Sequence, residues 1–186
     1  MAPKPQNTIF LCEHFPVYTM GIRSKVPPGE IDRLKELGAE FHFTDRGGLI
    51  TFHGPGQLMC YPVLDLGSFR RSVRWYVGSL EETVVRTCKE LGVSAGTTCN
   101  TGVWVGNNKI AALGIHVSKW ITSHGIALNC NSDLEWFDHI IPCGLVGKGV
   151  TSLSKETNRN VTVSEAAGKF LQSFSDVFQC EVKTGD

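Results

Sequence analysis

The sequence carries no surplus of charge of either sign, because 18 Lys and Arg balance 18 Asp and Glu among its 186 residues. A protein that binds nucleic acid without sequence preference usually has a basic surplus, so this balance disfavours that class. The chain also has no apolar run long enough to cross a bilayer, which argues against an integral membrane protein. Internal repeats and low-complexity stretches are absent as well.

Cysteine occurs seven times, but without the patterns that give it a structural task. The count is odd, the spacing is wide and no CxxC pair occurs, which disfavours both a disulfide framework and a thiolate zinc site. No secretory signal is apparent, so we expect a reducing compartment and no bound metal. At least one thiol is then available for chemistry.

The sequence does contain enough apolar material for one packed domain, since 41% of its residues are hydrophobic and 19% are charged. Apolar residues recur every three or four positions over 72–92 and again over 163–178, which predicts two amphipathic helices. The second begins at a capping pair, Thr162 and Glu165, and a shorter helix is predicted between Gly29 and Gly38. Alternating or short apolar runs predict strands over 8–12, 17–20, 40–44, 102–105, 110–117 and 121–129.

These elements predict a single α+β domain with one mixed, mostly antiparallel sheet flanked by helices. We expect the domain to comprise residues 8–180, with a flexible N-terminus at 1–7 and a tail at 181–186.

Three glycine-rich segments carry more isolated polar residues than a scaffold needs. The first, RGGLITFHGPGQ at 46–57, places Arg46 and His53 at the two ends of a short run. Gly47 and Gly48 leave the backbone open to a ligand, and both ends of the run can face one concavity. The plainer interpretation is a strand ending in a turn, with His53 as a hydrogen-bonded residue of the scaffold.

The second segment, GNNKIAALGIHV at 106–117, brings Lys109 into an apolar strand. A lysine at the edge of a hairpin is usually a solvated charge. The small residues that follow leave room for a ligand, however, and apolar surroundings make a lysine lose its proton more readily.

The third segment, at 140–153, presents Cys143 between a proline and a glycine. Nearby backbone N–H groups can stabilise a thiolate or an oxyanion, so Cys143 is the candidate nucleophile. Lys109, His53 and His124 are the available proton acceptors. Composition and spacing do not choose among them, and predict only cysteine-dependent acyl transfer or hydrolysis.

At these positions the chain resembles the lipoyl(octanoyl) transferases, and most of all their animal mitochondrial form. The matching segments are RGGLITFHGPGQLMCYPVLDL at 46–66, GVWVGNNKIAALGIHV at 102–117, TSHGIALN at 122–129 and PCGLVGKGVTSLSKE at 142–156. The resemblance implies a fold related to the lipoate and biotin protein ligases. It also implies that residues 8–180 are a catalytic domain without the strand and helix with which family members usually begin.

The resemblance further implies a reaction and residue roles. An octanoyl group would move from acyl carrier protein to a lysine of a lipoyl domain through a Cys143 thioester, the first step of endogenous protein lipoylation. Lys109 matches the lysine that lowers the pKa of this cysteine and moves protons, and we add the Gly144 amide as an oxyanion donor. The implied substrate-binding residues are Arg46, Gly47, Gly48, Leu49, Ile50, Thr51, Phe52, His53, Ala112, Leu113, Gly114, Gly125, Ile126 and Ala127.

The expected donor is octanoyl-acyl carrier protein, whose phosphopantetheine arm delivers the acyl group, so no further cofactor is expected. The expected acceptors are the glycine cleavage H protein and the E2 subunits of 2-oxoacid dehydrogenases. A mitochondrial monomer that contacts neither nucleic acid nor membrane completes this expectation. The densest basic cluster, Arg70, Arg71 and Arg74, is either a docking site for the acidic carrier or a solvated helix start.

Three alternatives stay open from the sequence. An ATP-dependent lipoate–protein ligase would share the fold but needs no equivalent of Cys143. A non-catalytic scaffold would bind lipoyl domains or carrier protein without chemistry. A cysteine hydrolase would use His53 or His124 as its base.

Overall fold

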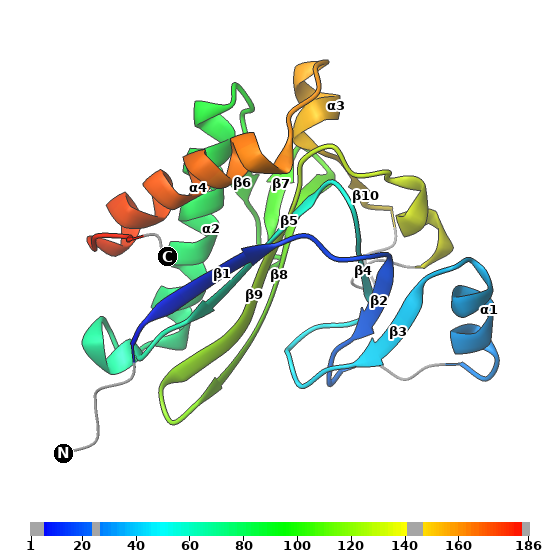
Figure 1. Ribbon diagram of the computed structural model, residues 1–186, viewed down its shortest axis with the longest axis horizontal. Coiled ribbons are helices and arrows are strands. Elements are labelled where there is room, and N and C mark those ends of the chain that lie inside the picture. The colour runs from blue at the N-terminus through cyan, green and yellow to red at the C-terminus, as the bar shows by residue number, and fades with distance from the viewer. Residues whose placement is uncertain (1–5, 24–26, 141–146, 184–186) are drawn as a thin grey trace.

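The computed structural model describes residues 6–23, 27–140 and 147–183, and shows two β-sheets with helices packed on them (Figure 1). Within these residues the larger sheet has the strand order β1-β5-β9-β8-β7-β6, with β10 paired to β8, and the smaller has the order β3-β2-β4. The strands are β1 (Thr8–Cys12), β2 (Val17–Met20), β3 (Glu40–Phe43), β4 (Thr51–His53), β5 (Gln57–Val63), β6 (Gly96–Thr97), β7 (Val103–Val105), β8 (Asn108–Ser118), β9 (Ile121–Asn129) and β10 (Gly149–Val150). The helices are α1 (Glu30–Glu36), α2 (Val73–Glu90), α3 (Leu153–Thr157) and α4 (Val163–Phe178), and η1 (Leu66–Ser68) and η2 (Glu135–His139) are short 3₁₀ turns.

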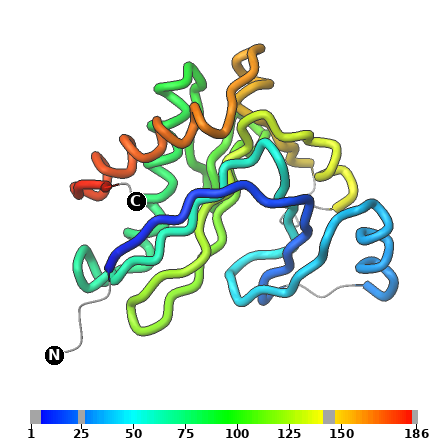
Figure 2. The backbone as a smooth tube through the Cα atoms, in the orientation of Figure 1, coloured from blue at the N-terminus to red at the C-terminus, as the bar shows by residue number. Residues whose placement is uncertain are grey.

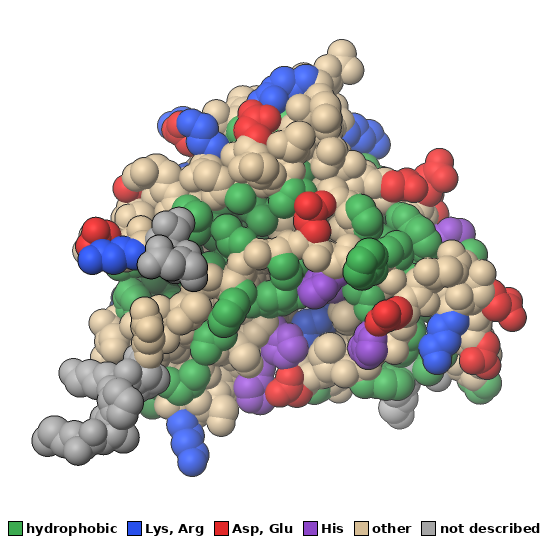
Figure 3. Space-filling view, viewed as in Figure 1, with side chains coloured by type: hydrophobic (Ala, Val, Ile, Leu, Met, Phe, Trp, Pro, Cys, Tyr) green, Lys and Arg blue, Asp and Glu red, His purple; other side chains and the backbone are tan. Residues whose placement is uncertain are grey.

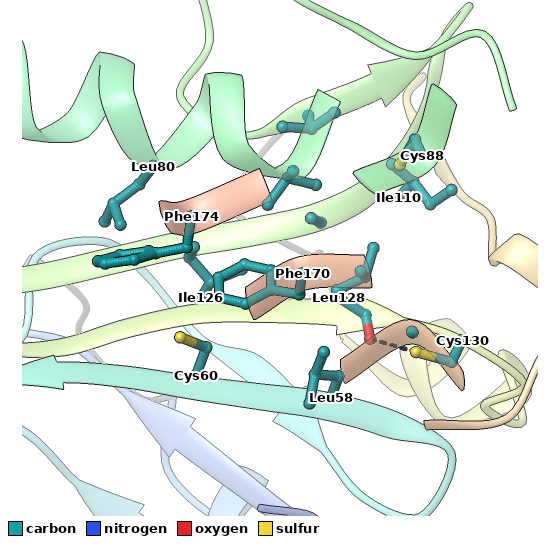
Figure 4. Packing of buried hydrophobic residues seen from close by; sticks show 14 of the residues in the cluster. Leu58, Cys60, Leu80, Cys88, Ile110, Ile126, Leu128, Cys130, Phe170 and Phe174 are labelled. Carbon is teal, nitrogen blue, oxygen red and sulfur yellow. Dashed lines mark hydrogen bonds between the residues drawn. The ribbon is translucent and has the colours of Figure 1, made fainter. Parts of the chain in front are cut away.

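The two long helices lie side by side over one face of the larger sheet (Figures 1 and 2). Both begin at a capping side chain: the Thr162 hydroxyl accepts from the Glu165 N–H, as predicted, and the Ser72 hydroxyl accepts from the Trp75 N–H. The main core fills the space between helices and sheet (Figure 4). It includes Leu58, Leu80, Cys88, Ile110, Ile126, Leu128, Phe170 and Phe174.

The predicted α+β domain with a mixed, mostly antiparallel sheet is confirmed, but its strands divide between two sheets. β1 pairs antiparallel with β5 of the larger sheet, whereas β2 pairs with β3 and β4. Pro16 interrupts the chain between β1 and β2, because proline lacks the N–H that a ladder needs. The smaller sheet has its own core of Tyr18, Leu34, Ala39, Phe52 and Phe137.

The hairpin predicted around Gly106 forms as β7 and β8, and β9 pairs along the length of β8. The short β10 then joins β8 in parallel, with Gly149 opposite Asn108 and Val150 opposite Lys109. This pairing brings a late part of the chain against the start of β8. No helix in the described part of the chain has both the length and the apolar character needed to span a bilayer.

Residues on both sides of the predicted domain, 8–180, contact the fold. Asn7 already contacts the fold, because its side-chain oxygen accepts from the Asp65 N–H at 2.7 Å. Val182, in the predicted tail, packs against the main core. The segments predicted as a flexible N-terminus and as a tail therefore each include a residue that contacts the domain.

Candidate active site

A cavity of about 590 Å³ lies between the β8–β9 hairpin and the smaller sheet. Histidine side chains gather around the hollow on this face of the molecule (Figure 3). Eleven of the predicted substrate-binding residues line the cavity: Arg46, Gly48, Leu49, Thr51, His53, Ala112, Leu113, Gly114, Gly125, Ile126 and Ala127. Segments far apart in the sequence thus meet at one site.

The small residues of β8 and β9 face one another across the strand pair. Ala112 is opposite Ala127, and Gly114 is opposite Gly125. A Cβ at Gly114 would lie 2.9 Å from Cδ of Arg46, so the glycine makes room for that side chain. Both alanines and both glycines line the cavity, in agreement with the predicted low bulk of its floor.

One of the predicted contributions, that of Gly125, differs in the structure. A Cβ at Gly125 would collide with the Cys60 carbonyl of β5, so this glycine permits the close approach of a strand rather than the entry of a ligand. Leu113 and Ile126, which were expected to form a wall of the cavity, are among the residues that line it. Leu113 also packs against the main core and Ile126 lies within it, because side chains alternate between the two faces of a strand.

Arg46 is buried and ties the segment that follows β3 to β2. Its guanidinium donates to the Thr19 carbonyl at 2.9 Å, to the Thr19 hydroxyl at 2.8 Å and to the Gly47 carbonyl at 3.1 Å. Gly47 itself pairs with the Ile115 backbone at 3.0 Å. The other predicted residues of this run outside the cavity lining, Ile50 and Phe52, belong to the small core.

His53 is the hydrogen-bonded scaffold residue of the plainer interpretation. Its Nδ1–H donates to Oε1 of Gln57 at 2.8 Å, a proton position that follows because the Gln57 amide NH₂ donates to Asn129 Oδ1 at 2.8 Å. Asn129 in turn donates to the Thr151 carbonyl at 2.9 Å. Burial lowers the pKa of His53 to about 4, so the imidazole is neutral at physiological pH and is a weak base.

Lys109 is buried, with 8% of its surface exposed, and the solvated interpretation is therefore wrong. Its Nζ donates to the Thr101 carbonyl at 3.2 Å and lies 4.8 Å from the centre of the Trp104 ring. Lys109 lines a small void of about 20 Å³ that shares Thr51 and Ala112 with the large cavity. Lys109 thus lines a void that adjoins the large cavity.

An irregularity in β8 accounts for this position. Val103 pairs with Ala111 but Trp104 pairs with Lys109, so Ile110 is an extra residue on β8. Ile110 and Ala111 consequently both enter the main core, and the alternation of faces is shifted by one residue. Without this bulge, Lys109 would lie on the opposite face from Ala112, because the two are three residues apart.

His124, the remaining candidate base, lines the cavity and is paired with an acid. Its Nε2 lies 2.6 Å from Oδ1 of Asp45, and this hydrogen bond holds the pKa of the Asp45 carboxyl below its usual value. His116 approaches the same residue, with its Nδ1 3.2 Å from the Asp45 carbonyl oxygen. The structure thus couples His124 to a surface carboxylate.

The candidate nucleophile Cys143 and its neighbour Gly144 lie outside the described residues. The chain after them is held against β8, where the Thr151 N–H donates to the Lys109 carbonyl at 3.0 Å. The segment that carries Cys143 is therefore followed, a few residues later, by direct contact with the strand of Lys109.

The six other cysteines are free thiols. Cys60, Cys88 and Cys130 are buried, and burial raises the pKa of all three thiols, that of Cys88 and Cys130 to about 12. Burial also raises the pKa of Cys12 and Cys180, whereas Cys99 is exposed. None of these six lines the cavity, and no cluster of His, Cys, Asp or Glu in the described ranges is arranged to hold a metal ion.

Several cavity residues escaped the sequence analysis. Met59 and Tyr61 face the cavity from β5, while Cys60 between them enters the core. Thr19 and His14 line it from the beginning of the chain, and His14 Nε2 lies 2.6 Å from the Tyr61 hydroxyl. The two-residue alternation within 57–63 was the available signal, but it shows two faces without showing which one meets a ligand.

The sequence of this chain is similar to those of known enzymes. The model of the lipoyl protein ligase A/B catalytic domain matches residues 1–175. A mitochondrial octanoyl-[acyl-carrier-protein]:protein N-octanoyltransferase of Danio rerio is 61% identical over 94% of this chain and 78% of its own length. The protein of the same description from Homo sapiens is 51% identical over 97% and 80%. An octanoyltransferase of Bacteroides fragilis is 46% identical over 86% and 76%.

Solved structures agree in fold at much lower sequence identity. Lipoate-protein ligase A bound with ATP superposes with a TM-score of 0.81 at 16% identity, over 98% of this chain and 76% of that one. A bi-partite lipoate protein ligase from Thermoplasma acidophilum, described with its E2 lipoyl domain, gives 0.79 at 18% over 98% and 75%. A biotin protein ligase from Aquifex aeolicus gives 0.55 at 18% over 88% and 70%. The predicted relation to the lipoate and biotin ligase fold is confirmed.

Proposed function

Because the chain belongs to the lipoyl protein ligase A/B catalytic domain family, we propose that it is an acyltransferase that moves an octanoyl group from octanoyl-acyl carrier protein to a lysine of a lipoyl domain. The observation that carries this proposal is the 61% identity, over 94% of the chain, with an enzyme named for octanoyl transfer. The reaction is the first step of endogenous protein lipoylation.

The cavity suits the acyl group. An octanoyl chain contains six methylenes, and removing them from water contributes about 5 kcal/mol at about 0.8 kcal/mol each. Ala112, Ala127, Met59 and Val17 supply apolar surface to a cavity of about 590 Å³. Lys109 lies beside this space, where the reactive end of the acyl chain would have to be held.

The proposed chemistry proceeds in two transfers. The Cys143 thiolate attacks the carrier thioester, the carbon–sulfur bond to phosphopantetheine breaks, and the released thiolate takes a proton from the Lys109 ammonium. The neutral amine of the acceptor lysine then attacks octanoyl-Cys143. An amide bond forms, Cys143 leaves as the thiolate, and the proton lost by the attacking amine returns to Lys109. The amide of Gly144 stabilises both tetrahedral oxyanions.

The burial of Lys109 supports its proposed role. A cation that is shielded from water interacts more strongly with a neighbouring thiolate than an exposed one does. The hydrogen bond to the Thr101 carbonyl and the contact with Trp104 limit the positions that the amine can adopt. We assign Lys109 and Cys143 as the catalytic residues.

The partners follow from the same proposal. The donor is acyl carrier protein, which delivers the acyl group on its phosphopantetheine arm without a further cofactor. The acceptors are lipoyl domains, including the glycine cleavage H protein and dehydrogenase E2 subunits, and the protein acts as a monomer. A mitochondrial location is supported by the relatives from Danio rerio and Homo sapiens, both described as mitochondrial.

The alternatives receive less support. A hydrolase would need a histidine base, but burial lowers the pKa of His53 to about 4, which makes it a weak base. An ATP-bound lipoate-protein ligase shares the fold at 16% identity, whereas the three octanoyltransferases compared above are 46% to 61% identical to this chain. A scaffold would have no use for a buried lysine beside the cavity.

Incubation with octanoyl-acyl carrier protein, followed by intact mass measurement, tests the proposal. We expect one octanoyl adduct that is removed by hydroxylamine, that is absent in Cys143→Ser, and that passes to an added lipoyl domain without ATP. Lys109→Ala should slow the transfer at least about 100-fold, the scale of a general acid–base contribution. Strict ATP dependence would replace the proposal with a ligase, free octanoate with a hydrolase, and the absence of any adduct with a scaffold.

A further inference from the structure

The side chain of Lys109 is enclosed by the chain segment that precedes β8. Nζ donates to the Thr101 carbonyl at 3.2 Å, and a Cβ at Gly102 would come within 3.1 Å of Cε of the lysine. The ring of Trp104 lies 4.8 Å from Nζ. Residues 101–104 therefore surround the lysine from its stem to its amine.

Trp104 is itself held in one position. Only 3% of its surface is exposed, and its indole N–H donates to the Asn100 carbonyl at 3.1 Å. The bulge in β8 places Trp104 directly opposite Lys109 in the strand pair. The register of the sheet, rather than a chance rotamer, thus brings the ring and the amine together.

The aromatic ring interacts more favourably with the charged form of Lys109 than with the neutral form. The face of an indole attracts a cation, and the attraction is strongest where water is excluded, as it is around this buried pair. Burial and like charge act in the opposite direction. The like charge is that of Lys148, whose Nζ lies 5.9 Å from the same ring and donates to Asn107 Oδ1. The nearby acid is Glu81 of α2, which accepts from the Gly102 N–H at 2.9 Å.

We infer that Trp104 is a positioning residue of the transferase, whose indole face holds the ε-ammonium of Lys109 beside the acyl cavity and interacts more favourably with this cation than with the neutral amine. The inference rests on the role proposed above for Lys109. Trp104 acts through the lysine and does not line either cavity.

The direct test measures the protonation of Lys109 without any acyl substrate. Acetic anhydride labels only the neutral amine, and peptide mass spectrometry follows Lys109 across a pH series. In Trp104→Leu we expect the pH of half-maximal labelling to fall by about one unit, the scale of a buried cation–π contact. Trp75→Leu is the matched control, because Trp75 lies on α2 and packs against Phe69 and against Phe178 of α4. This variant should leave that pH unchanged.

A second series keeps the shape of the ring. Tryptophan analogues with one to four fluorines are introduced at position 104 alone. Each added fluorine weakens the negative electrostatic potential at the ring face. The pH of half-maximal labelling should fall with each fluorine. This series also decides the matter if Trp104→Leu does not fold. An unchanged pH across the fluorine series would overturn the inference.

Kinetics supply an independent readout. Trp104→Leu should lower kcat about tenfold, leave KM within about twofold, and move the alkaline limb of the pH profile to lower pH. Trp104→Phe should recover most of the activity, because phenylalanine retains an aromatic face. A wild-type protein that transfers no octanoyl group refutes the proposed function, whereas an active enzyme whose Trp104 variants leave labelling and pH profile unchanged refutes only the role of Trp104.

Discussion

At the scale of single residues, the candidate site depends on polar side chains that the fold removes from water. His53, Gln57, Asn129 and the Thr151 carbonyl form one chain of hydrogen bonds that runs from the smaller sheet across β5 and β9 to the segment beside Lys109. Such a buried chain stabilises the fold only when every member keeps its hydrogen-bond partner. The free energy of unfolding therefore falls when one member changes its charge.

The pKa of His53 gives this chain a measurable pH dependence. The imidazole titrates near 6.5 in the unfolded chain but near 4 in the folded protein. Between these values the unfolded state binds more protons, so the free energy of unfolding falls as the pH falls from 6.5 towards 4. The expected loss is about 3 kcal/mol, and it is absent above pH 6.5.

Urea unfolding of the wild type and His53→Gln at pH 7.5, 6, 5 and 4 measures this loss. His53→Gln should be less stable at pH 7.5 but should show a flatter pH dependence. His139→Asn, which changes a histidine outside the cavity, should keep the slope of the wild type. Equal slopes in the wild type and His53→Gln would refute the assignment.

Residue types were easier to predict from the sequence than their surroundings. Glycine and isolated polar residues interrupt apolar runs in the segments that hold Arg46, His53 and the small residues of β8 and β9, and the structure brings these segments together around one cavity. The burial of Lys109 was not predictable, since it depends on the extra residue at Ile110. A bulge leaves no mark in a pattern of apolar residues.

At the scale of elements, the close pairing of β5 and β9 sets the shape of the cavity floor. A Cβ at Gly125 would collide with the Cys60 carbonyl and approach Cδ of Pro62 to 2.8 Å. Neither atom can move without shifting β5, which pairs with both β1 and β9.

Gly125→Ala should therefore destabilise the protein by about 2–3 kcal/mol, because overpacking against backbone cannot relax by rotation of a side chain. Gly168→Ala is the matched control, since Gly168 is exposed on α4 with nothing within 4 Å of an added Cβ. That control should gain about 0.5–1 kcal/mol from the higher helix propensity of alanine. Thermal unfolding of the two variants tests the opposite signs, and a neutral Gly125→Ala would contradict the proposed collision.

Individual elements were predictable where a local signal defines them. The recurrence of apolar residues over 72–92 and 163–178, and the capping pair Thr162 and Glu165, marked the two long helices. The division of the strands into two sheets was not, because β2 pairs with β4 more than thirty residues later in the sequence. Which strands pair is decided by long-range packing, and the apolar pattern of a strand is the same in either sheet.

At the scale of the whole molecule, two cores of unequal size enclose the cavity. The larger lies between the seven-stranded sheet and the long helices, and the smaller beneath β2–β4 contains Tyr18, Leu34 and Phe52. A smaller core provides less free energy against local opening.

Hydrogen exchange should therefore be faster for the backbone amides of β2–β4 than for those of β5, β8 and β9. Loading with an octanoyl group, which would contact both sheets, should slow exchange in β2–β4 while leaving α2 unchanged. Exchange measured by mass spectrometry on the free and acylated protein tests this expectation. Equal protection of both sheets in the free protein would show that they open as one unit.

The seclusion of Cys60, Cys88 and Cys130 makes the protein a convenient reporter of its own acylation. These sulfur atoms are sealed in the main core and hold their protons firmly at neutral pH. Maleimides and iodoacetamides should react slowly with them in the native state, which leaves the exposed Cys99 and the partly exposed Cys12 and Cys180 as competitors among the described thiols. Replacing those three side chains with serine would then let a fluorescent tag count occupied and vacant nucleophiles in real time, with no need to rebuild the interior.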